Sequence, residues 1–261
     1  MYHSRSVQIL EELAASTWNQ IKASESLGLP YAEETITEVN NLSMRAARIP
    51  ELLVAPVSKR KEAIFGLDWT WFIGSDKKGW WQYAVQAKRI DSSRKYPQIR
   101  YKVRGRLQSS ILREYALDHR AIPLYCLYNF EPSLSHGDCW NCRQPFDEEQ
   151  LGCTLLPLDV AVTFSKKGAR STFRQIHSNE AAIPWRCILK CPGLNPADHN
   201  YPHPLASKGF FHVRRSESLP PEIDRLRSRL SLSDEVASAP AFSESEIVPR
   251  HVIVIDTGEE R

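Results

Sequence analysis

Two apolar runs with the alternation of β-strands, at residues 59–73 and 80–90, limit the fold of this chain more than any other feature. A short polar turn with glycine at both ends joins them, which predicts a hairpin of adjacent strands. Successive side chains of a strand point to opposite faces, so Gln86 and Lys88 share one face of the second strand. The sequence therefore predicts a strand that carries a polar pair within apolar surroundings.

Asp68 stands in the first of these runs and adds an acid to the polar pair of the second. An acid on one strand and Gln-x-Lys on the next is the arrangement that a metal-dependent phosphodiesterase needs. Asp68 would ligate the cation, and Lys88 would orient the attacking water and offset negative charge as it develops. We therefore take Asp68, Gln86 and Lys88 as candidate catalytic residues.

The segment Val85-Gln86-Ala87-Lys88-Arg89, together with Asp68, resembles the PD-(D/E)xK nuclease superfamily. It is most similar to the Mrr-like restriction endonuclease branch, in which Gln replaces the second acid of the motif. Leu67 stands where the name-giving proline would be. Gln86 is a neutral and weaker metal ligand than Glu, which affects metal affinity and the choice of cation.

This resemblance implies an α/β fold with a restriction-endonuclease-like core, that is, a mixed central sheet flanked by helices. It implies a Mg²⁺- or Mn²⁺-dependent endonuclease that hydrolyses DNA phosphodiester bonds, with a role in restriction or phage defence. It also implies Asp68, Gln86 and the carbonyl of Ala87 as metal ligands, and Lys88 as the catalytic cation. DNA is the implied partner, and RNA as a substrate and a homodimeric assembly are left open.

Residues 33–48 have helical spacing and place Glu34 and Glu38 one turn apart. Members of the nuclease superfamily often contribute an acid from their first core helix to the metal site. The resemblance therefore implies Glu34 as an accessory catalytic and metal-binding acid, with Glu38 in reserve. The alternative is structural, because the helix dipole favours acids in the first turns. The predicted core face of this helix consists of Ile36, Val39, Ser43 and Ala46.

The rest of the chain favours a layered α/β core. A helix is expected at residues 6–24 and another around 107–116, and residues 122–130 form the nearly continuous apolar run of a strand buried on both faces. We expect a nuclease domain at residues 1–165 and an irregular C-terminal extension at 166–261. The extension is expected to contain a linker at 214–250, a short helix at 221–231 and a terminal strand at 252–255 that returns to the sheet edge.

Four tryptophans, Trp69, Trp71, Trp80 and Trp81, lie in or beside the two strand-like runs. We expect them to fill the core or its rim. Stacking of one of them on an extruded base is the alternative.

The window from residue 88 to 106 is strongly basic, with eight lysines and arginines and one acid, Asp91. A basic patch directly after the candidate catalytic strand is where a phosphate backbone would lie. The alternative is a solvated loop and helix face. The candidate nucleic-acid contacts are Arg89, Arg94, Lys95, Arg100, Lys102 and Arg104.

Six cysteines include two closely spaced pairs, a C-x2-C and a C-x3-C, whose thiolates could point at one ion. Together the pairs predict a zinc site that pins the tail onto the core. An iron–sulfur cluster and free structural thiols stay open as alternatives. Cys126 and Cys153 have apolar neighbours and are expected in the core. The candidate zinc ligands are Cys139, Cys142, Cys187 and Cys191.

Composition is that of an ordinary globular protein, with 42% hydrophobic and 25% charged residues. No run reaches the 18 or so apolar residues of a membrane span, and the N-terminal residues lack the pattern of a signal peptide. We therefore expect a cytoplasmic protein that does not act on membranes.

The whole chain also resembles an uncharacterised bacterial family, and that likeness implies a fold and no established activity. Two rival functions stay open. One is a catalytically silent nucleic-acid-binding or protein-interaction module on the same fold, which the neutral Gln86 favours. The other makes the cysteine-bearing tail a protein-binding appendage of a toxin or defence system. The shared segments are Glu33-Glu34-Thr35-Ile36-Thr37, Asp68-Trp69, Gln86-Ala87-Lys88-Arg89 and Pro123-Leu124-Tyr125-Cys126-Leu127-Tyr128-Asn129.

Overall fold

The computed structural model describes residues 5–57, 64–135, 137–166, 170–191, 194, 202–230 and 247–258. Its helices are α1 (Arg5–Leu27), α2 (Glu33–Ala46), α3 (Gln108–Asp118), α4 (Leu158–Ser165), α5 (Phe173–His177), α6 (Cys187–Lys190) and α7 (Pro221–Leu230), with short 3₁₀ turns η1 (Pro97–Arg100), η2 (Glu148–Gly152) and η3 (Lys208–Phe210). Its strands are β1 (Leu52–Pro56), β2 (Ile64–Ser75), β3 (Gly79–Arg89), β4 (Lys102–Val103), β5 (Arg106–Leu107), β6 (Ile122–Tyr128), β7 (Cys153–Pro157), β8 (Ile183–Pro184) and β9 (Ile247–Asp256).

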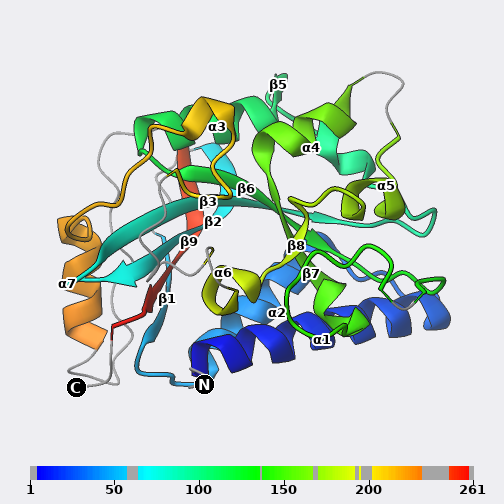
Figure 1. The fold of residues 1–261 in the computed structure, drawn as a ribbon, viewed down its shortest axis with the longest axis horizontal. Coiled ribbons are helices and arrows are strands. Elements are labelled where there is room, and N and C mark those ends of the chain that lie inside the picture. The colour runs from blue at the N-terminus through cyan, green and yellow to red at the C-terminus, as the bar shows by residue number, and fades with distance from the viewer. Residues whose placement is uncertain are drawn as a thin grey trace.

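A mixed sheet of the strand order β1-β9-β2-β3-β6-β7-β8 runs through the described part of the chain, and β4 pairs with β5 in a separate hairpin. β2 is antiparallel to β3 and parallel to β9, and β3 is parallel to β6. Helices α1 and α2 lie on one side of the sheet and α3 and α4 on the other, with α7 beside the β2–β3 turn (Figure 1). This arrangement confirms the predicted α/β class with a mixed central sheet flanked by helices.

The alternation of β2 shows which helix layer each face of the sheet meets. Thr70 Oγ1 lies 3.2 Å from the hydroxyl of Tyr115 on α3. The ring of Trp71 contacts Trp185, whose indole N–H donates to the carbonyl of Leu10 on α1. Even-numbered residues of β2 therefore face α3, and odd-numbered residues face α1.

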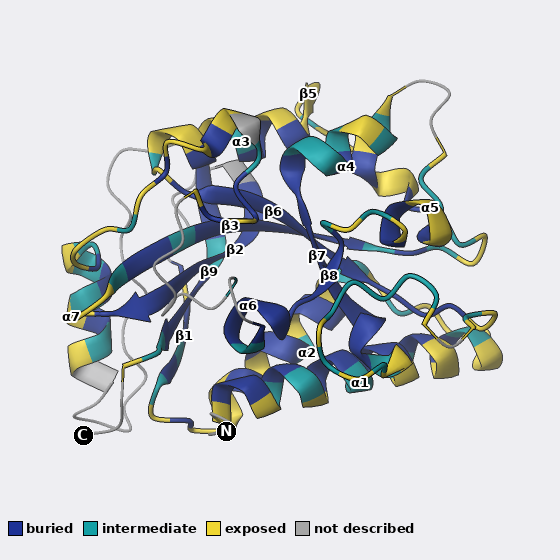
Figure 2. Ribbon diagram, viewed as in Figure 1, coloured by how far each residue is buried: buried dark blue, intermediate teal, exposed yellow. Residues whose placement is uncertain are grey.

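The predicted strands and their burial are largely confirmed. β2 and β3 match the two strand-like runs, although residues 59–63 of the first run lie outside the described residues. Every residue of β6 is buried, as expected of a strand covered on both faces, and the sheet as a whole is the most buried layer (Figure 2). The tryptophans are core residues rather than stacking platforms, because none is more than 2% exposed; they are Trp69, Trp71, Trp80 and Trp81.

The C-terminal strand differs from our expectation. We placed a strand at residues 252–255 on the sheet edge, whereas β9 is ten residues long and lies inside the sheet, between β1 and β2. Its residues Ile253 and Ile255 are fully buried in the main core. The prediction was wrong about the position because an apolar run shows that a strand is buried but not which strands it pairs with.

The apolar core also continues past residue 165. Trp185, Cys187 and Ile188 belong to the same buried cluster as the residues of α1 and β6. The predicted short helix is α7, which packs Ile223 and Leu226 against the sheet. Residues 231–246 of the predicted linker lie outside the described residues. Among the described helices, none combines the length and the apolar character needed to cross a bilayer.

Candidate metal and catalytic site

Asp68 lies on β2 across from Gln86 on β3, one position beyond the Trp69–Val85 pair. Its Oδ2 atom accepts a hydrogen bond from the backbone N–H of Ala87 at 2.7 Å and another from the side-chain amide of Gln86. Asp68 is only 8% exposed. The end of the β2–β3 ladder therefore holds a buried acid whose partners come from the adjacent strand.

Gln86 brings the three predicted ligands together. Its Nε2 atom donates to Asp68 Oδ2 and to the carbonyl of Ala87, the latter at 3.2 Å. A carboxylate oxygen and a carbonyl oxygen thus converge on one positively polarised group. The Oε1 atom of Gln86 is buried and has no hydrogen-bond partner among the described residues. The amide of Gln86 consequently has an unused acceptor beside two further oxygen ligands.

Lys88 is held in place by an acid of α2. Its Nζ atom lies 3.0 Å from Oε1 of Glu33, and the other oxygen of Glu33 accepts the backbone N–H of Arg89 at 3.0 Å. Lys88 is 3% exposed, so this ion pair is shielded from water on the side of the lysine. One carboxylate therefore fixes both the side chain of Lys88 and the end of the strand that carries it.

The acid of α2 that contacts Lys88 is Glu33, a residue that the sequence analysis did not name as a candidate for the site. Glu34 is 68% exposed and pairs with Arg250 of β9 at 2.9 Å, and the reserve candidate Glu38 lies 3.5 Å from His251. The predicted core face of α2 was out of phase by about one residue. The residues that α2 buries are Ile36, Thr37, Asn40, Asn41 and Met44, which put Glu33 on the buried stripe.

The surroundings of Asp68 shift the pKa of its carboxyl upward. Burial, and next to it the negative charge of Glu33, raise the pKa of this carboxyl, which comes to about 6 once all its neighbours are included. Lys88, the Ala87 N–H and Arg250 act in the opposite direction without cancelling the effect of burial. Arg250 Nε lies 3.9 Å from Asp68 Oδ1. A divalent cation at the carboxylate would supply the charge that these groups do not.

Two further side chains complete the site, and sequence reasoning missed both. Arg250 sits at the start of β9, so its position beside Asp68 depends on β9 being an inner strand. Tyr125 of β6 pairs with Gln86, and its hydroxyl is buried with no partner among the described residues. The run of apolar residues around Tyr125 gave no sign of a polar role.

The basic residues nearest the site are bound within the protein. Arg94 forms a two-point ion pair with Glu25 of α1, at 3.0 and 2.7 Å, and donates to the carbonyl of Phe130 at 2.9 Å. Arg89 is half-buried, and its backbone N–H is bound to Glu33. These contacts give Arg94 a structural role that its charge alone did not indicate.

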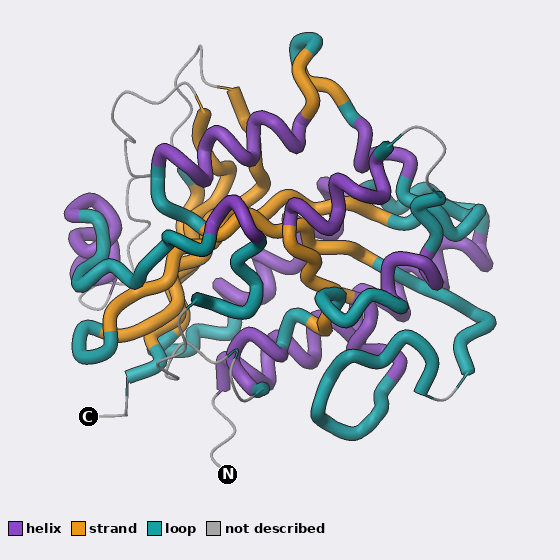
Figure 3. Tube along the Cα trace, turned by 45° about the horizontal axis from the view of Figure 1, so that its top comes forward, coloured by secondary structure: helices purple, strands orange, loops and turns teal. Residues whose placement is uncertain are grey.

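The other predicted phosphate contacts lie further out. Lys95, Arg100, Lys102 and Arg104 are all exposed, and Arg100 donates to the carbonyl of Lys166. Lys102 and Arg104 belong to the β4–β5 hairpin, which projects from the molecule just before α3 (Figure 3). Since α3 packs on the face of the sheet that carries Asp68 and Thr70, the hairpin lies on the same side as the candidate site.

Three of the four predicted zinc ligands come together. The Sγ atoms of Cys142, Cys187 and Cys191 all lie within 4.8 Å of one another. Cys139 does not join them, since its Sγ atom lies 3.9 Å from the carbonyl of Arg174. The structure thus supports a three-cysteine cluster that could hold a metal. Cys126 and Cys153 are fully buried, as predicted for core thiols.

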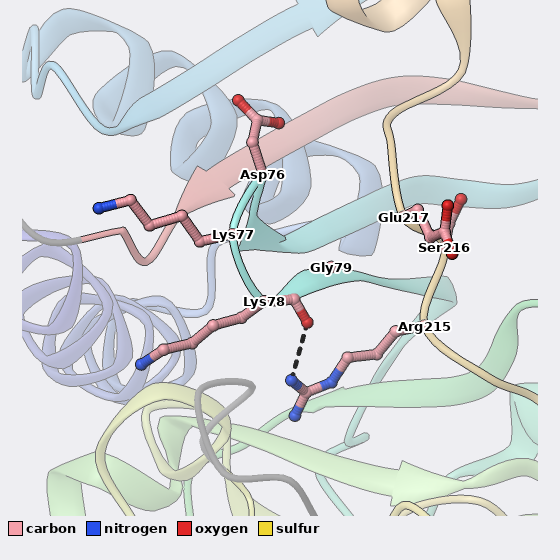
Figure 4. Close-up of a pocket in the computed structure, with 7 residues that line it drawn as sticks. All are labelled: Asp76, Lys77, Lys78, Gly79, Arg215, Ser216 and Glu217. Carbon is pink, nitrogen blue, oxygen red and sulfur yellow. Dashed lines mark hydrogen bonds between the residues drawn. The ribbon is translucent and has the colours of Figure 1, made fainter.

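A surface hollow at the β2–β3 turn does not resemble a catalytic site. It is lined by charges of both signs, and the side chains of Lys77 and Lys78 point away from Arg215, whose guanidinium donates to the carbonyl of Lys78 at 3.0 Å (Figure 4). The hollow lies at the opposite end of β2 and β3 from Asp68. Its lining residues are Asp76, Lys77, Lys78, Gly79, Arg215, Ser216 and Glu217.

Comparison with known proteins gives a family and no activity. No curated protein and no solved structure matches the chain. A family of unknown function, DUF6615, matches residues 6–261. That match includes the Asp68 site, the β4–β5 hairpin and the cysteine cluster. The chain therefore belongs to the family of unknown function DUF6615.

Proposed function

We propose that the protein is a divalent-metal-dependent nuclease that hydrolyses DNA phosphodiester bonds. The observation that carries this proposal is the convergence of Asp68 Oδ2, the Gln86 amide and the Ala87 carbonyl on one buried point. Lys88 stands two residues along the same strand, held by Glu33. These are the groups that the resemblance to the PD-(D/E)xK superfamily assigns to the metal and to the transition state.

The residues present fit an oxygen-loving cation. With its amide turned over, Gln86 would place Oε1 beside Asp68 Oδ2, two acceptors that only a cation or a proton between them could hold together. Carboxylate, amide and backbone carbonyl oxygens are ligands that Mg²⁺ and Mn²⁺ accept. When bound, such a cation would supply a water of lowered pKa and charge stabilisation at the phosphate.

Lys88 and Glu33 would have different roles in the reaction. Lys88 carries the positive charge that stabilises the phosphoryl oxygens as negative charge develops on them. Glu33 is a positioning residue, because it binds Lys88 and the Arg89 N–H and so fixes where that charge is. The exposed fraction of the side chain rises from 3% at Lys88 to 24% at Glu33 and 68% at Glu34. A phosphate would therefore reach Lys88 from the side on which Glu34 lies.

We propose restriction of foreign DNA as the biological role, which is the role that the resemblance implies. The β4–β5 hairpin, with Lys102 and Arg104 exposed, supplies basic side chains on the same side of the sheet as Asp68. The cleavage assay with RNA tests RNA as a substrate, and the molecular mass of the protein in solution tests a homodimer as the active assembly.

A catalytically silent binding module is the second candidate. The Lys88–Glu33 ion pair at 3.0 Å favours it, because Glu33 already neutralises the lysine that catalysis would use. The two candidates differ in whether a divalent cation binds at Asp68.

Cleavage of supercoiled, linear and single-stranded DNA and of RNA should be measured with Mn²⁺, with Mg²⁺ and with EDTA. The nuclease proposal predicts cleavage that requires the metal and that the Asp68→Asn variant lacks. Metal binding to the parent protein without cleavage of any substrate would favour the silent module. Cleavage that persists in Asp68→Asn would assign the activity to a contaminant.

A further inference from the structure

Three cysteine sulfurs meet between two connections of the fold. Cys142 lies in the connection from β6 to η2, while Cys187 and Cys191 begin and follow the short helix α6. Cys187 and Cys191 are buried, and Cys142 is half-buried. We propose that Cys142, Cys187 and Cys191 bind one zinc ion as thiolates, at a site separate from Asp68.

The sulfur spacing fits a single ion. Tetrahedral zinc with Zn–S bonds of about 2.3 Å places its sulfurs about 3.8 Å apart. Here Cys142 Sγ lies 3.2 Å from Cys187 Sγ and 3.6 Å from Cys191 Sγ. A [4Fe–4S] cluster binds each cysteine to a different iron and so requires its cysteine sulfurs to be further apart. The three thiols therefore match a mononuclear soft-metal site, with a fourth position outside this set.

Backbone N–H groups and a guanidinium surround the sulfurs, and such groups stabilise the negative charge of thiolates. The backbone N–H of Gln144 points to Cys142 Sγ at 3.4 Å, and the backbone N–H of Arg143 donates to Cys191. The guanidinium of Arg186 adds positive charge near Cys142 and is fixed by Glu11 at 2.9 Å. Such outer contacts orient thiolate ligands and offset the negative charge of a three-thiolate zinc centre.

The loop that carries Cys142 is shaped without help from a metal. The side-chain amide of Asn141 donates to the carbonyls of His177, Asn179 and Ala182 at 2.8 to 2.9 Å. These bonds hold the loop against the segment between α5 and β8, and they leave Cys142 facing α6. Cys139, three residues earlier, points elsewhere and provides a matched control for the loss of a thiol from the same loop.

Zinc content per chain should be measured by mass spectrometry on the full-length protein purified without chelators. We expect one zinc in the parent, in Cys139→Ser and in Asp68→Ala, and almost none in Cys142→Ser or Cys191→Ser. The Asp68→Ala variant keeps this result independent of the proposed nuclease metal. A parent protein without zinc would overturn the proposal, as would a loss of zinc in Cys139→Ser equal to that in Cys142→Ser.

A second measurement does not depend on the folding of the serine variants. After removal of zinc, the parent protein is titrated with Co²⁺. Three thiolates should produce a sulfur-to-cobalt charge-transfer band and the strong visible absorption of a tetrahedral site, saturating at one ion per chain. Cobalt that binds without a charge-transfer band would show that the cysteines are not the ligands and would refute the assignment.

Discussion

Asp68 and Lys88 divide the proposed chemistry between them at the scale of single residues. Asp68 is a buried acid whose pKa is raised, first by burial and then by Glu33. A bound cation would therefore stabilise its ionised form. Lys88 is fixed by Glu33 rather than by Asp68. Metal binding and transition-state stabilisation should therefore be separable by substitution.

The Asp68→Asn variant should lose both Mn²⁺ binding and cleavage, because its side chain cannot balance the charge of the cation. Lys88→Met should lose cleavage by about 100- to 1000-fold, the typical effect of removing one preorganised charge, while keeping most of the metal affinity. Titration calorimetry with Mn²⁺ and single-turnover cleavage rates measure the two effects. Lys22→Met, at an exposed lysine of α1, is the control. Full cleavage by Lys88→Met would contradict its role.

Glu33 and Glu34 are neighbours with different contacts, which makes them a matched pair. Glu33→Gln should lower the cleavage rate by about 10- to 100-fold with little change in substrate affinity, because it loosens Lys88 without touching the phosphate. Glu34→Gln, which loses only the exposed pair with Arg250, should stay close to the parent. Steady-state kinetics on a short duplex separate kcat from KM. Equal losses in the two variants would rule out positioning by Glu33.

At the scale of elements, the first turn of α2, the start of β2 and the end of β3 build the site together. α2 brings Glu33 to the end of β3, and the β2–β3 pairing places Asp68 across from Gln86. The β4–β5 hairpin leads directly into α3, which packs on the same face as Thr70. For this reason we expect a duplex that binds at Asp68 to contact the hairpin as well.

The hairpin should contribute to DNA affinity through counterion release. In a Lys88→Met background, which binds without cleaving, log affinity for duplex DNA should fall with log salt at about −0.9 per phosphate contact. Lys102→Gln and Arg104→Gln should each reduce this slope by about one unit. Arg225→Gln on α7 is an exposed control. The same slope in all four proteins would show that the hairpin does not touch the backbone.

The features that the sequence predicted correctly are those that depend on residues close together in the chain. Alternation and burial identified β2, β3 and β6, and alternation alone put Gln86 and Lys88 on one face. Glu33 was not among the predicted site residues, because the small difference in helical phase that buries it depends on how α2 packs. Arg250 could not be placed at all, since its neighbour Asp68 is brought to it only by the pairing of β9 with β2.

At the scale of the whole molecule, one buried cluster connects α1, the sheet and α6. Beside this cluster, His177 of α5 is fully buried; its Nδ1 lies 2.9 Å from the carbonyl of Phe173, and its Nε2 lies 3.1 Å from Thr154 Oγ1. A neutral ring with the proton on Nδ1 satisfies both contacts. Burial lowers the pKa of His177 to about 4.

This depressed pKa makes stability depend on pH. The unfolded chain binds a proton at a histidine near pH 6.5 whereas the folded protein resists it, so the unfolding free energy should fall as pH drops from about 6.5 to about 4, by roughly 1.4 kcal/mol per pH unit from this residue. Urea unfolding of the parent, His177→Gln and the exposed control His212→Gln at several pH values measures the slope. The slope should be smaller in His177→Gln alone. A slope that His177→Gln leaves unchanged would assign the pH dependence to other groups.

The inner position of β9 also determines when this protein can fold. Leu52 of β1 pairs with Ile255 of β9, and Trp69 of β2 pairs with His251 of β9. Neither pair can form before β9 has been synthesised. Until β9 has been synthesised, the edges of β1 and β2 that pair with it stay open, and pairings this distant in sequence form slowly. A nascent chain with these open strand edges is prone to pair with other nascent chains on the same polysome. The insertion of β9 between β1 and β2 removes these edges and with them this risk of aggregation.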